Sequence, residues 1–402
     1  MLPRFLCVSL YVLSAALEFS CAQPLPGQAG TALDFSVPVG VETAPSGTFE
    51  GFSVIVGQVE VVGVSEQLKV VMDTGSNLLA ICSSKDLSGL PFNGTHACAT
   101  YGGNGALASS LTGRWMGPSS VVSGSLRLEN EFLVSMTSDD LDWCSFGLDG
   151  IFGLDVFPSH GFASPVSADQ CASPAWRPSH VDHVSLPSPF RSVWTSGTKF
   201  GFFLQETGGQ LVGGSGVENL TRELRLVGRA PVPSFARDAV FQVALLGVAF
   251  EGGASVSGSA VLELDSGTPW LGNLPDMLIE SFPSGSFQGL RSVPSSVSTL
   301  KLTLAGVDGP FEISLDMENL REREATRGAV QVAPSGFESA KGWGISSLLG
   351  LPVFLSFFVV MSKEEIAFYE YPQEGGHGGE EEGGLVTAAS TLGPRFRNLL
   401  QA

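Results

Sequence analysis

Two similar short stretches, one in each half of the chain, constrain its fold more than any other feature of the sequence. The first reads Asp73-Thr74-Gly75-Ser76 and the second reads Asp265-Ser266-Gly267-Thr268. Each follows a run of aliphatic residues typical of a strand, and each places one acid in a turn of hydroxyl residues and glycine. The repetition predicts two similar lobes, each of which supplies one carboxylate.

Paired carboxylates indicate a specific chemistry. Two carboxyl groups within hydrogen-bonding distance cannot both ionise, so they share a proton and titrate in separate steps. The ionised group can take a proton from water while the protonated one polarises a carbonyl, which gives hydrolysis without a covalent intermediate. We expect Thr74 and Ser266 to link the two loops, and Ser76 and Thr268 to donate to the outer carboxylate oxygens.

Composition limits the class of protein. A chain of 402 residues has room for two or three domains, and 43% apolar against 15% charged residues describes a folded protein. The formal net charge of -19 argues against a nucleic acid or an anionic membrane as partner, because both attract clusters of Lys and Arg.

Short apolar runs separated by turn residues dominate the chain from residue 49 onwards. Strands are expected first at 52–56, 59–64 and 68–72, and one short helix at 274–282. This pattern predicts an all-β protein. The most apolar run, 345–361, contains Ser, Gly and Pro and is shorter than a bilayer requires, so we expect buried strands there and no transmembrane span.

The N-terminus predicts entry into the secretory pathway. One positive charge within residues 1–4 precedes an apolar core at 5–17, as in a signal peptide cleaved before Gln23. In a secreted chain the four remaining cysteines predict two disulfides. Proximity favours, among three possible connectivities, the pairs Cys82 with Cys98 and Cys144 with Cys171. Asn93 and Asn219 begin glycosylation sequons. The expected location is secreted or in an endomembrane or vacuolar lumen.

Changes in composition along the sequence divide the chain into five expected parts. The expected parts are a signal peptide (1–22), a short extension or pro-segment (23–48), an N-terminal β lobe with the first Asp (49–225), a C-terminal β lobe with the second Asp (226–372) and a flexible Gly- and Glu-rich tail (373–402).

Other catalytic signatures are missing from the sequence. It contains no G-x-S-x-G nucleophile elbow and no Gly-Lys step of a phosphate-binding loop. His180 and His183 lie three apart, but in a Pro-rich stretch with no Cys nearby. We therefore expect no cofactor and no metal.

The chain resembles the pepsin-like aspartic peptidases over most of 49–371. The two Asp signatures are similar to that family's catalytic motifs. Segments 149–154 and 348–354 resemble the hydrophobic-hydrophobic-Gly segments that complete the two active-site loops. The resemblance implies a bilobal fold of two β-rich lobes with an active-site cleft between them. It also implies catalytic roles for Asp73 and Asp265, a peptide or protein as substrate, and a monomer.

The resemblance also implies a β-hairpin flap over the cleft that carries a Tyr, and here two registers are open. Gly113-Arg114-Trp115 is similar to the Gly-Lys-Trp of beta-secretase-type flaps, which places Ser110 or Leu111 where the Tyr belongs. Tyr101 is the other candidate. After the first signature, most members have a Trp where this chain has Ala80, as beta-secretase-type members do.

Three functions follow as hypotheses. The first is an aspartic endopeptidase in which Asp73 and Asp265 activate water. The second is a catalytically weak or inactive relative that binds peptides or acts as an inhibitor, which Ala80, the doubtful flap Tyr and Leu351-Pro352 favour. A carbohydrate-binding or adhesive β-sandwich would fit the composition but not the paired motifs.

Overall fold

The structure is a computed structural model. It describes residues 32–43, 51–101, 109–139, 144, 147–155, 188–205, 208–232, 241–253, 255–285, 290–323, 330–334 and 347–372. The predicted signal peptide and C-terminal tail, together with Cys171, His180 and His183, lie outside these residues.

Most of the described chain forms two β-sheets, so the all-β prediction is confirmed. The larger sheet has thirteen strands in the order β11-β21-β20-β9-β10-β1-β2-β3-β8-β4-β7-β6-β5. Its strands are β1 (Phe35–Thr43), β2 (Ser53–Val61), β3 (Leu68–Asp73), β4 (Leu79–Cys82), β5 (Phe92–Tyr101), β6 (Ser109–Ser123), β7 (Leu126–Asp139), β8 (Gly150–Gly153), β9 (Phe200–Gln205), β10 (Gly208–Gly213), β11 (Leu226–Pro231), β20 (Phe357–Met361) and β21 (Glu365–Glu370).

The smaller sheet has eight strands in the order β15-β18-β14-β19-β13-β12-β16-β17. They are β12 (Gln242–Phe250), β13 (Ser255–Leu264), β14 (Leu271–Leu274), β15 (Arg291–Ser292), β16 (Thr299–Leu304), β17 (Phe311–Asp316), β18 (Gln331–Pro334) and β19 (Ser347–Leu349). The described helices are all short: α2 (Arg191–Thr195), α3 (Ser215–Thr221), α4 (Asp276–Ile279), α5 (Met317–Arg323) and α6 (Leu351–Ser356).

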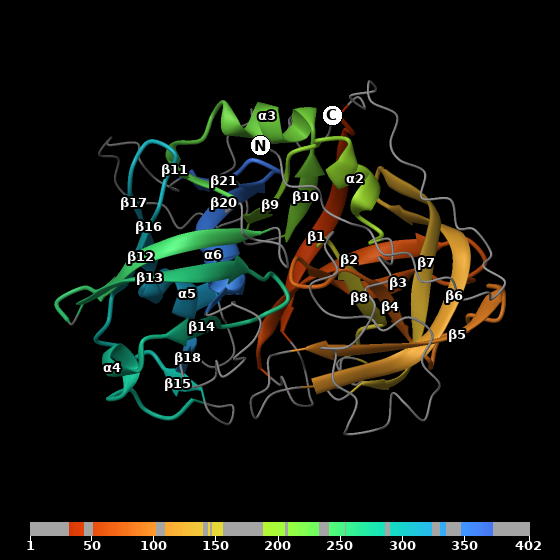
Figure 1. Ribbon diagram of the computed structural model, residues 1–402, viewed down its shortest axis with the longest axis horizontal. Coiled ribbons are helices and arrows are strands. Elements are labelled where there is room, and N and C mark those ends of the chain that lie inside the picture. Colours follow the sequence, from red (N-terminus) through yellow and green to blue (C-terminus); the bar gives the residue numbers. More distant parts are fainter. Residues whose placement is uncertain are drawn as a thin grey trace, which may run out of the picture.

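The two lobes lie side by side. Figure 1 shows β2 to β8 on one side of the molecule and β12 to β18 on the other, with β1, β9 and β10 between them. The larger sheet continues past the first lobe, because β20 pairs with β9 and β11 pairs with β21. The first strand of the predicted C-terminal lobe, β11, therefore belongs to the larger sheet.

Strand β1 corrects one expectation. It lies within 23–48, which the sequence analysis assigned to an extension or pro-segment, yet it pairs with both β10 and β2 inside the larger sheet. Phe35, Val37 and Val39 alternate with more exposed residues and are buried in the main core. This period of two marks a strand with one face in the core.

The apolar run 345–361 is part of the core, but it is not all strand. It forms β19, helix α6 and β20, and the five residues of β20 are all buried. The prediction of buried strands is wrong for α6. Pro352 fits the first turn of a helix, and a uniformly apolar run has no period that separates helix from strand. Among the described residues, no helix is long and apolar enough to cross a membrane. The short helix expected at 274–282 is present as α4.

Edge-to-face aromatic contacts connect the two sheets behind the paired Asp motifs. The rings of Phe190 and Phe200 lie 4.8 Å apart and those of Phe200 and Phe241 5.6 Å apart. Phe190 also contacts Phe152 of β8, at 6.5 Å. The Phe241 carbonyl accepts the N–H of Leu264, the last residue of β13. A chain of buried aromatic rings therefore connects β8, which pairs with β3, to Phe241, which hydrogen-bonds the end of β13.

Candidate active site

Asp73 and Asp265 both stand at the ends of buried strands. Val70, Val71 and Met72 of β3 are fully buried, and β3 pairs in parallel with β8 up to the register of Asp73 with Gly153. Strand β13 pairs in parallel with β19, and the Asp265 N–H donates to the Leu349 carbonyl at 3.0 Å. Each acid therefore lies at the end of its strand, next to segment 149–154 in the first lobe and next to segment 348–354 in the second.

Two hydroxyl residues join the loops across the lobe boundary. The Thr74 N–H donates to Ser266 Oγ at 2.9 Å, and the Ser266 N–H donates to Thr74 Oγ1 at 2.9 Å. Each hydroxyl in turn donates to the strand opposite, Thr74 to the Leu264 carbonyl at 2.8 Å and Ser266 to the Met72 carbonyl at 2.7 Å. Four buried hydrogen bonds thus fix the position of one loop relative to the other.

The glycines of the two signatures let the two carboxyl groups face each other. A Cβ atom placed on Gly75 would lie 2.6 Å from Cγ of Asp265, and one placed on Gly267 would lie 2.4 Å from Oδ1 of Asp73. Both distances are far below a van der Waals contact. Each loop therefore requires glycine because the acid of the other lobe lies directly against its backbone.

Each carboxylate is bound within its own loop. Asp73 accepts the Gly75 N–H at 2.8 Å and a short hydrogen bond from the Ser76 hydroxyl. Asp265 accepts the N–H groups of Gly267 at 2.9 Å and Thr268 at 3.2 Å, and the Thr268 hydroxyl at 2.6 Å. The inner and outer oxygens of both acids are thus oriented by fixed donors.

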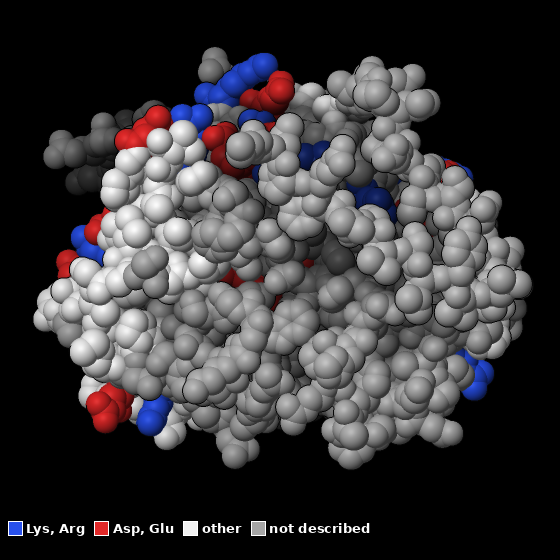
Figure 2. Space-filling model, in the orientation of Figure 1, with Lys and Arg blue, Asp and Glu red and all other residues white. Residues whose placement is uncertain are grey.

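The electrostatics of the pair favour a shared proton. Burial raises the pKa of Asp73 well above its ordinary value, and the nearby Asp265 carboxylate raises it further. The hydrogen bonds from Ser76 and Gly75 lower this pKa, but they do not reverse the shift. The pair therefore holds one proton at a pH where an ordinary Asp has lost it. Figure 2 shows acidic atoms set back from the surface near the middle of one face.

The completing segments close each loop with backbone hydrogen bonds. In the first lobe, Gly153 N–H donates to the Leu78 carbonyl at 2.7 Å and Leu154 N–H donates to the Asp73 carbonyl at 2.8 Å. In the second, the Leu351 N–H donates to the Thr268 carbonyl at 2.8 Å. The structure thus brings both predicted segments to the acids that they were expected to support.

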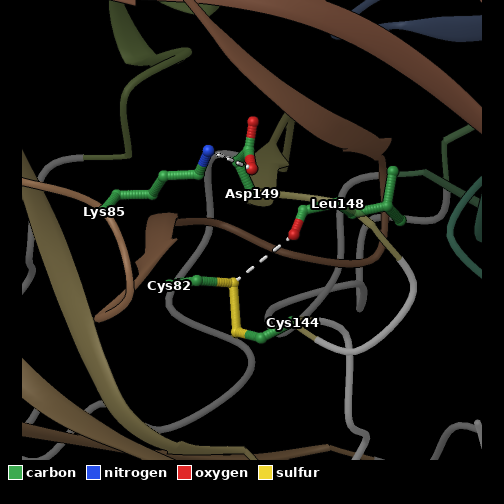
Figure 3. The surroundings of a disulfide bond; sticks show 5 residues. All are labelled: Cys82, Lys85, Cys144, Leu148 and Asp149. Atoms are coloured by element: carbon green, nitrogen blue, oxygen red, sulfur yellow. Dashed lines mark hydrogen bonds and ion pairs between the residues drawn. A yellow bond between two sulfur atoms is a disulfide. The ribbon is translucent and has the colours of Figure 1, made fainter. Parts of the chain in front are cut away.

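Both predicted disulfide pairs are wrong, because one cysteine of each predicted pair bonds to the other. Cys82 bonds to Cys144, across 62 positions, and not to Cys98 (Figure 3). Strand β4 ends at Cys82 and pairs with β8, which brings Cys82 to the chain that precedes β8. Proximity in the sequence did not reveal this strand pairing. The side chain of Cys98 lies outside the described residues.

An ion pair lies next to the disulfide. Figure 3 shows Lys85 directed at Asp149, and Lys85 Nζ lies 2.8 Å from its Oδ1. The second carboxylate oxygen of Asp149 accepts the Lys69 N–H at 2.8 Å. The Cys82 N–H donates to the Asp149 carbonyl at 2.8 Å. The start of β3, the end of β4 and the start of β8 therefore meet at Asp149, through both its carboxylate and its backbone carbonyl, and sequence reasoning missed this role.

The residues that were expected to form a flap lie in the antiparallel hairpin of β5 and β6. Tyr101 pairs with Ser109 and Thr100 with Ser110, but the side chains of Tyr101, Ser110 and Leu111 lie outside the described residues. Trp115 is buried in a small cluster with Ala80, whose other members are Leu78, Cys82, Val134 and Met136. The indole and the small side chain of Ala80 therefore belong to the same buried cluster.

The remaining predicted positions are placed as follows. Asn219 lies in α3, where its Oδ1 accepts an Arg222 N–H at 3.4 Å. Asn93 lies in β5, and its side chain is outside the described residues. Within the described part of the chain, no group of three or more His, Cys, Asp or Glu side chains could hold a metal ion.

Comparisons with known proteins support the fold. No protein-family model matches the chain, and no curated protein matches its sequence. The structure is similar to the crystal structure of an aspartic proteinase from Irpex lacteus, with a TM-score of 0.56 and 18% identity. The alignment covers 84% of this chain and 98% of that one. At this identity the similarity shows the pepsin-like fold, and the chemistry has to be inferred from the site itself.

Proposed function

We propose that the protein is an aspartic endopeptidase. The observation that carries the proposal is the pair Asp73 and Asp265, which lie against each other's glycine backbone and are fixed by reciprocal bonds of Thr74 and Ser266. A raised pKa at Asp73 supplies the one proton that such a pair needs.

The arrangement supports hydrolysis in two steps. Asp265 accepts a proton from a water molecule whose oxygen bonds to the peptide carbonyl carbon, while Asp73 donates its proton to the carbonyl oxygen, and a gem-diol forms. The gem-diol then breaks its C–N bond as the nitrogen receives the proton from Asp265 and a hydroxyl proton returns to Asp73. The pair ends in its starting state, and no covalent enzyme intermediate forms.

The test is cleavage of a denatured protein between about pH 3 and 7, with and without pepstatin. We expect cleavage by the wild-type protein and its loss in Asp73→Asn and Asp265→Asn. Asp308→Asn removes an exposed carboxylate of the second lobe and serves as the matched control, with activity retained. Full activity in either Asn variant of the pair would disprove the mechanism.

The second candidate function is peptide binding without turnover, as a binding or inhibitory module. The presence of Trp115 and Ala80 in one small buried cluster favours it, because most pepsin-like enzymes have a Trp where this chain has Ala80. Binding of a peptide by wild-type protein that cleaves nothing at any pH would establish this alternative.

We also propose that the protein passes through the secretory pathway. The Cys82–Cys144 disulfide supports an oxidising compartment, and the signal-like N-terminus agrees with it. Mass spectrometry of the purified native protein tests this proposal through its N-terminus, its disulfides and glycans at Asn93 and Asn219.

A further inference from the structure

Strand β6 changes its pairing partner partway along its length. From Ser109 to Met116 it pairs with β5, whereas Val121 and Val122 pair with β2. Strand β7 pairs with β6 along both parts, so β6 lies between β7 and these two successive partners (Figure 1). Residues 117–120, which we call the β6 junction, therefore connect the β5–β6 hairpin to the body of the first lobe.

Backbone pairing is irregular at the β6 junction. The register between β6 and β7 shifts between Met116 and Ser119, and again between Ser119 and Val121. Gly117 has a φ of +110°, and a Cβ atom placed on it would lie 2.9 Å from the Glu131 carbonyl oxygen, so this position requires glycine. Irregular pairing of this kind interrupts the ladder of hydrogen bonds, and the strand opens more easily at such a point.

Three hydrogen bonds hold the β6 junction to neighbouring segments. The Gly117 N–H donates to the Pro91 carbonyl at 2.9 Å. The Ser119 hydroxyl donates to the Val62 carbonyl at 2.6 Å, and the Val62 N–H donates to the Ser120 carbonyl at 2.9 Å. These bonds join the junction to the segment before β5 and to the turn after β2, so an opening of the junction has to break some of them.

Glu131 of β7 lies opposite the β6 junction. It pairs with Ser119, between the two register shifts, and it is only 8% exposed. Leu133 lies two residues further along β7 and belongs to the main hydrophobic core. Side chains two residues apart on a strand share one face, so the Glu131 side chain lies on the face of β7 that packs on this core. The junction thus lies beside a buried acid.

No charged partner compensates Glu131 among the described residues, and burial alone raises its pKa from 4.5 to about 7. Glu129, two residues before it, is exposed and accepts hydrogen bonds from Ser120 and Arg127. The side chain of His96 on β5 lies outside the described residues. Other charged groups on the surrounding segments interact elsewhere: Arg114 with the Phe92 ring, Glu60 with Gln67, Lys85 with Glu66 and Asp149, and Asp86 with Ser88.

We propose that Glu131 is a pH-sensitive switch that controls the β6 junction. The protonated carboxyl group stays in its buried position and the junction remains closed. The ionised group requires water, which reaches it when the junction opens, and the β5–β6 hairpin is then no longer held in one position. This hairpin contains the residues expected to form a flap, so the switch confines the proposed peptidase to acidic conditions. That consequence rests on the proposed function, whereas the opening itself does not.

Amide hydrogen exchange tests the opening without relying on catalysis. Exchange is measured in Asp73→Asn and in Asp73→Asn with Glu131→Gln, and the two proteins are compared at the same pH so that intrinsic exchange rates cancel. Because burial raises the pKa of Glu131 to about 7, only about one-tenth of it is protonated at about pH 8. Segments 116–121 and 61–64 should then exchange about tenfold faster when Glu131 is present. At about pH 5 the two proteins should exchange alike.

Cleavage tests the consequence for the proposed function. The ratio of kcat/KM between Glu131→Gln and wild-type protein is measured for one peptide from about pH 4 to about pH 7.5. The titration of Asp73 and Asp265 is common to both proteins and cancels in this ratio. We expect a ratio near one at acid pH and about fourfold at about pH 7.5, where only about a quarter of Glu131 is protonated. A loss of equal size at every pH would show a structural role and overturn the proposal.

Two further variants make the result specific. Glu131→Met removes the charge with a side chain of similar length that suits an apolar site, so it should behave as Glu131→Gln does. Glu129→Gln removes an exposed acid from the same strand and should keep the wild-type pH dependence in both measurements. If Glu129→Gln abolished the pH dependence as well, the effect would not belong to the buried carboxyl group and the proposal would fail.

The two measurements separate this inference from the proposed function. If wild-type protein cleaves nothing at any pH but exchange at the β6 junction depends on Glu131, the peptidase proposal fails and the switch stands. If peptides are cleaved and neither exchange nor the ratio depends on Glu131, the switch fails alone. If exchange depends on Glu131 while the ratio stays at one, the junction opens without controlling cleavage, and the regulation fails. If nothing is cleaved and exchange does not depend on Glu131, both proposals fail.

Discussion

The two candidate active-site loops share the pattern of Asp, hydroxyl residue, Gly and hydroxyl residue, but they are supported by different means. Behind Asp73, the supports are polar and covalent: the Cys82–Cys144 disulfide and the Lys85–Asp149 ion pair join three strand ends. Behind Asp265, the support is apolar, since the residues of α6 from Leu351 to Leu355 are all buried. Two similar loops are therefore held in place by different kinds of packing.

The largest expected effect tests what the loops share. Gly75→Ala and Gly267→Ala each place a methyl group against the acid of the other lobe, so each should lower kcat/KM by about 100-fold or more. Because the two sites are symmetric, the two losses should be similar. Gly258→Ala on β13 has no atom within 4 Å of the new methyl group and should retain activity. A large loss of kcat/KM in only one of these two variants would show that the two loops are not equivalent.

The next effect tests the covalent support of the first lobe. Replacing Cys82 and Cys144 by Ala removes a cross-link across 62 positions, so the free energy of unfolding should fall by about 3–4 kcal/mol. Amide hydrogen exchange should increase in β4 and β8 and remain unchanged in β13 and β19. Equal increases in both lobes would contradict the idea that the two supports are independent.

A pH effect should also be confined to the first lobe. Burial raises the pKa of Glu131 on β7 from 4.5 to about 7. Between these values the folded state binds the proton and the unfolded state does not, so Glu131 contributes most stability below about pH 4.5 and loses it as the pH rises to about 7.

Glu131→Gln should therefore remove about 2 kcal/mol of this pH dependence, measured by urea unfolding at several pH values. Asp73→Asn is the suitable background, because it removes the other acid whose pKa is strongly raised. An unchanged pH dependence in Glu131→Gln would show that its carboxyl group is not desolvated in solution.

The smallest effect concerns the ion pair. Asp149→Asn retains an oxygen for the Lys69 N–H but loses the charge opposite Lys85, and the free energy of unfolding should fall by about 1–2 kcal/mol. Lys85→Met should cost a similar amount, and the double variant should cost less than the sum. Additive losses would show that the two side chains do not interact in solution.

The sequence was sufficient for the paired loops, because Asp, hydroxyl residue and Gly recur after two apolar strands. The sequence did not predict the disulfide and the helix that support these loops. The Cys82–Cys144 bond depends on the pairing of β4 with β8, and helix α6 lies in a run without a readable period.

The larger sheet has a consequence for how the chain folds. Strand β1, near the middle of the sheet, begins at residue 35, whereas β20 and β21 in the same sheet cover residues 357–361 and 365–370. The hairpins β6–β7 and β12–β13 can form from local contacts as soon as their residues have been synthesised. The larger sheet can be completed only after β20 and β21, the last strands of the described chain, have been synthesised. Pairings between such distant segments form slowly, so we expect this sheet to close last and a protein truncated before β20 to aggregate.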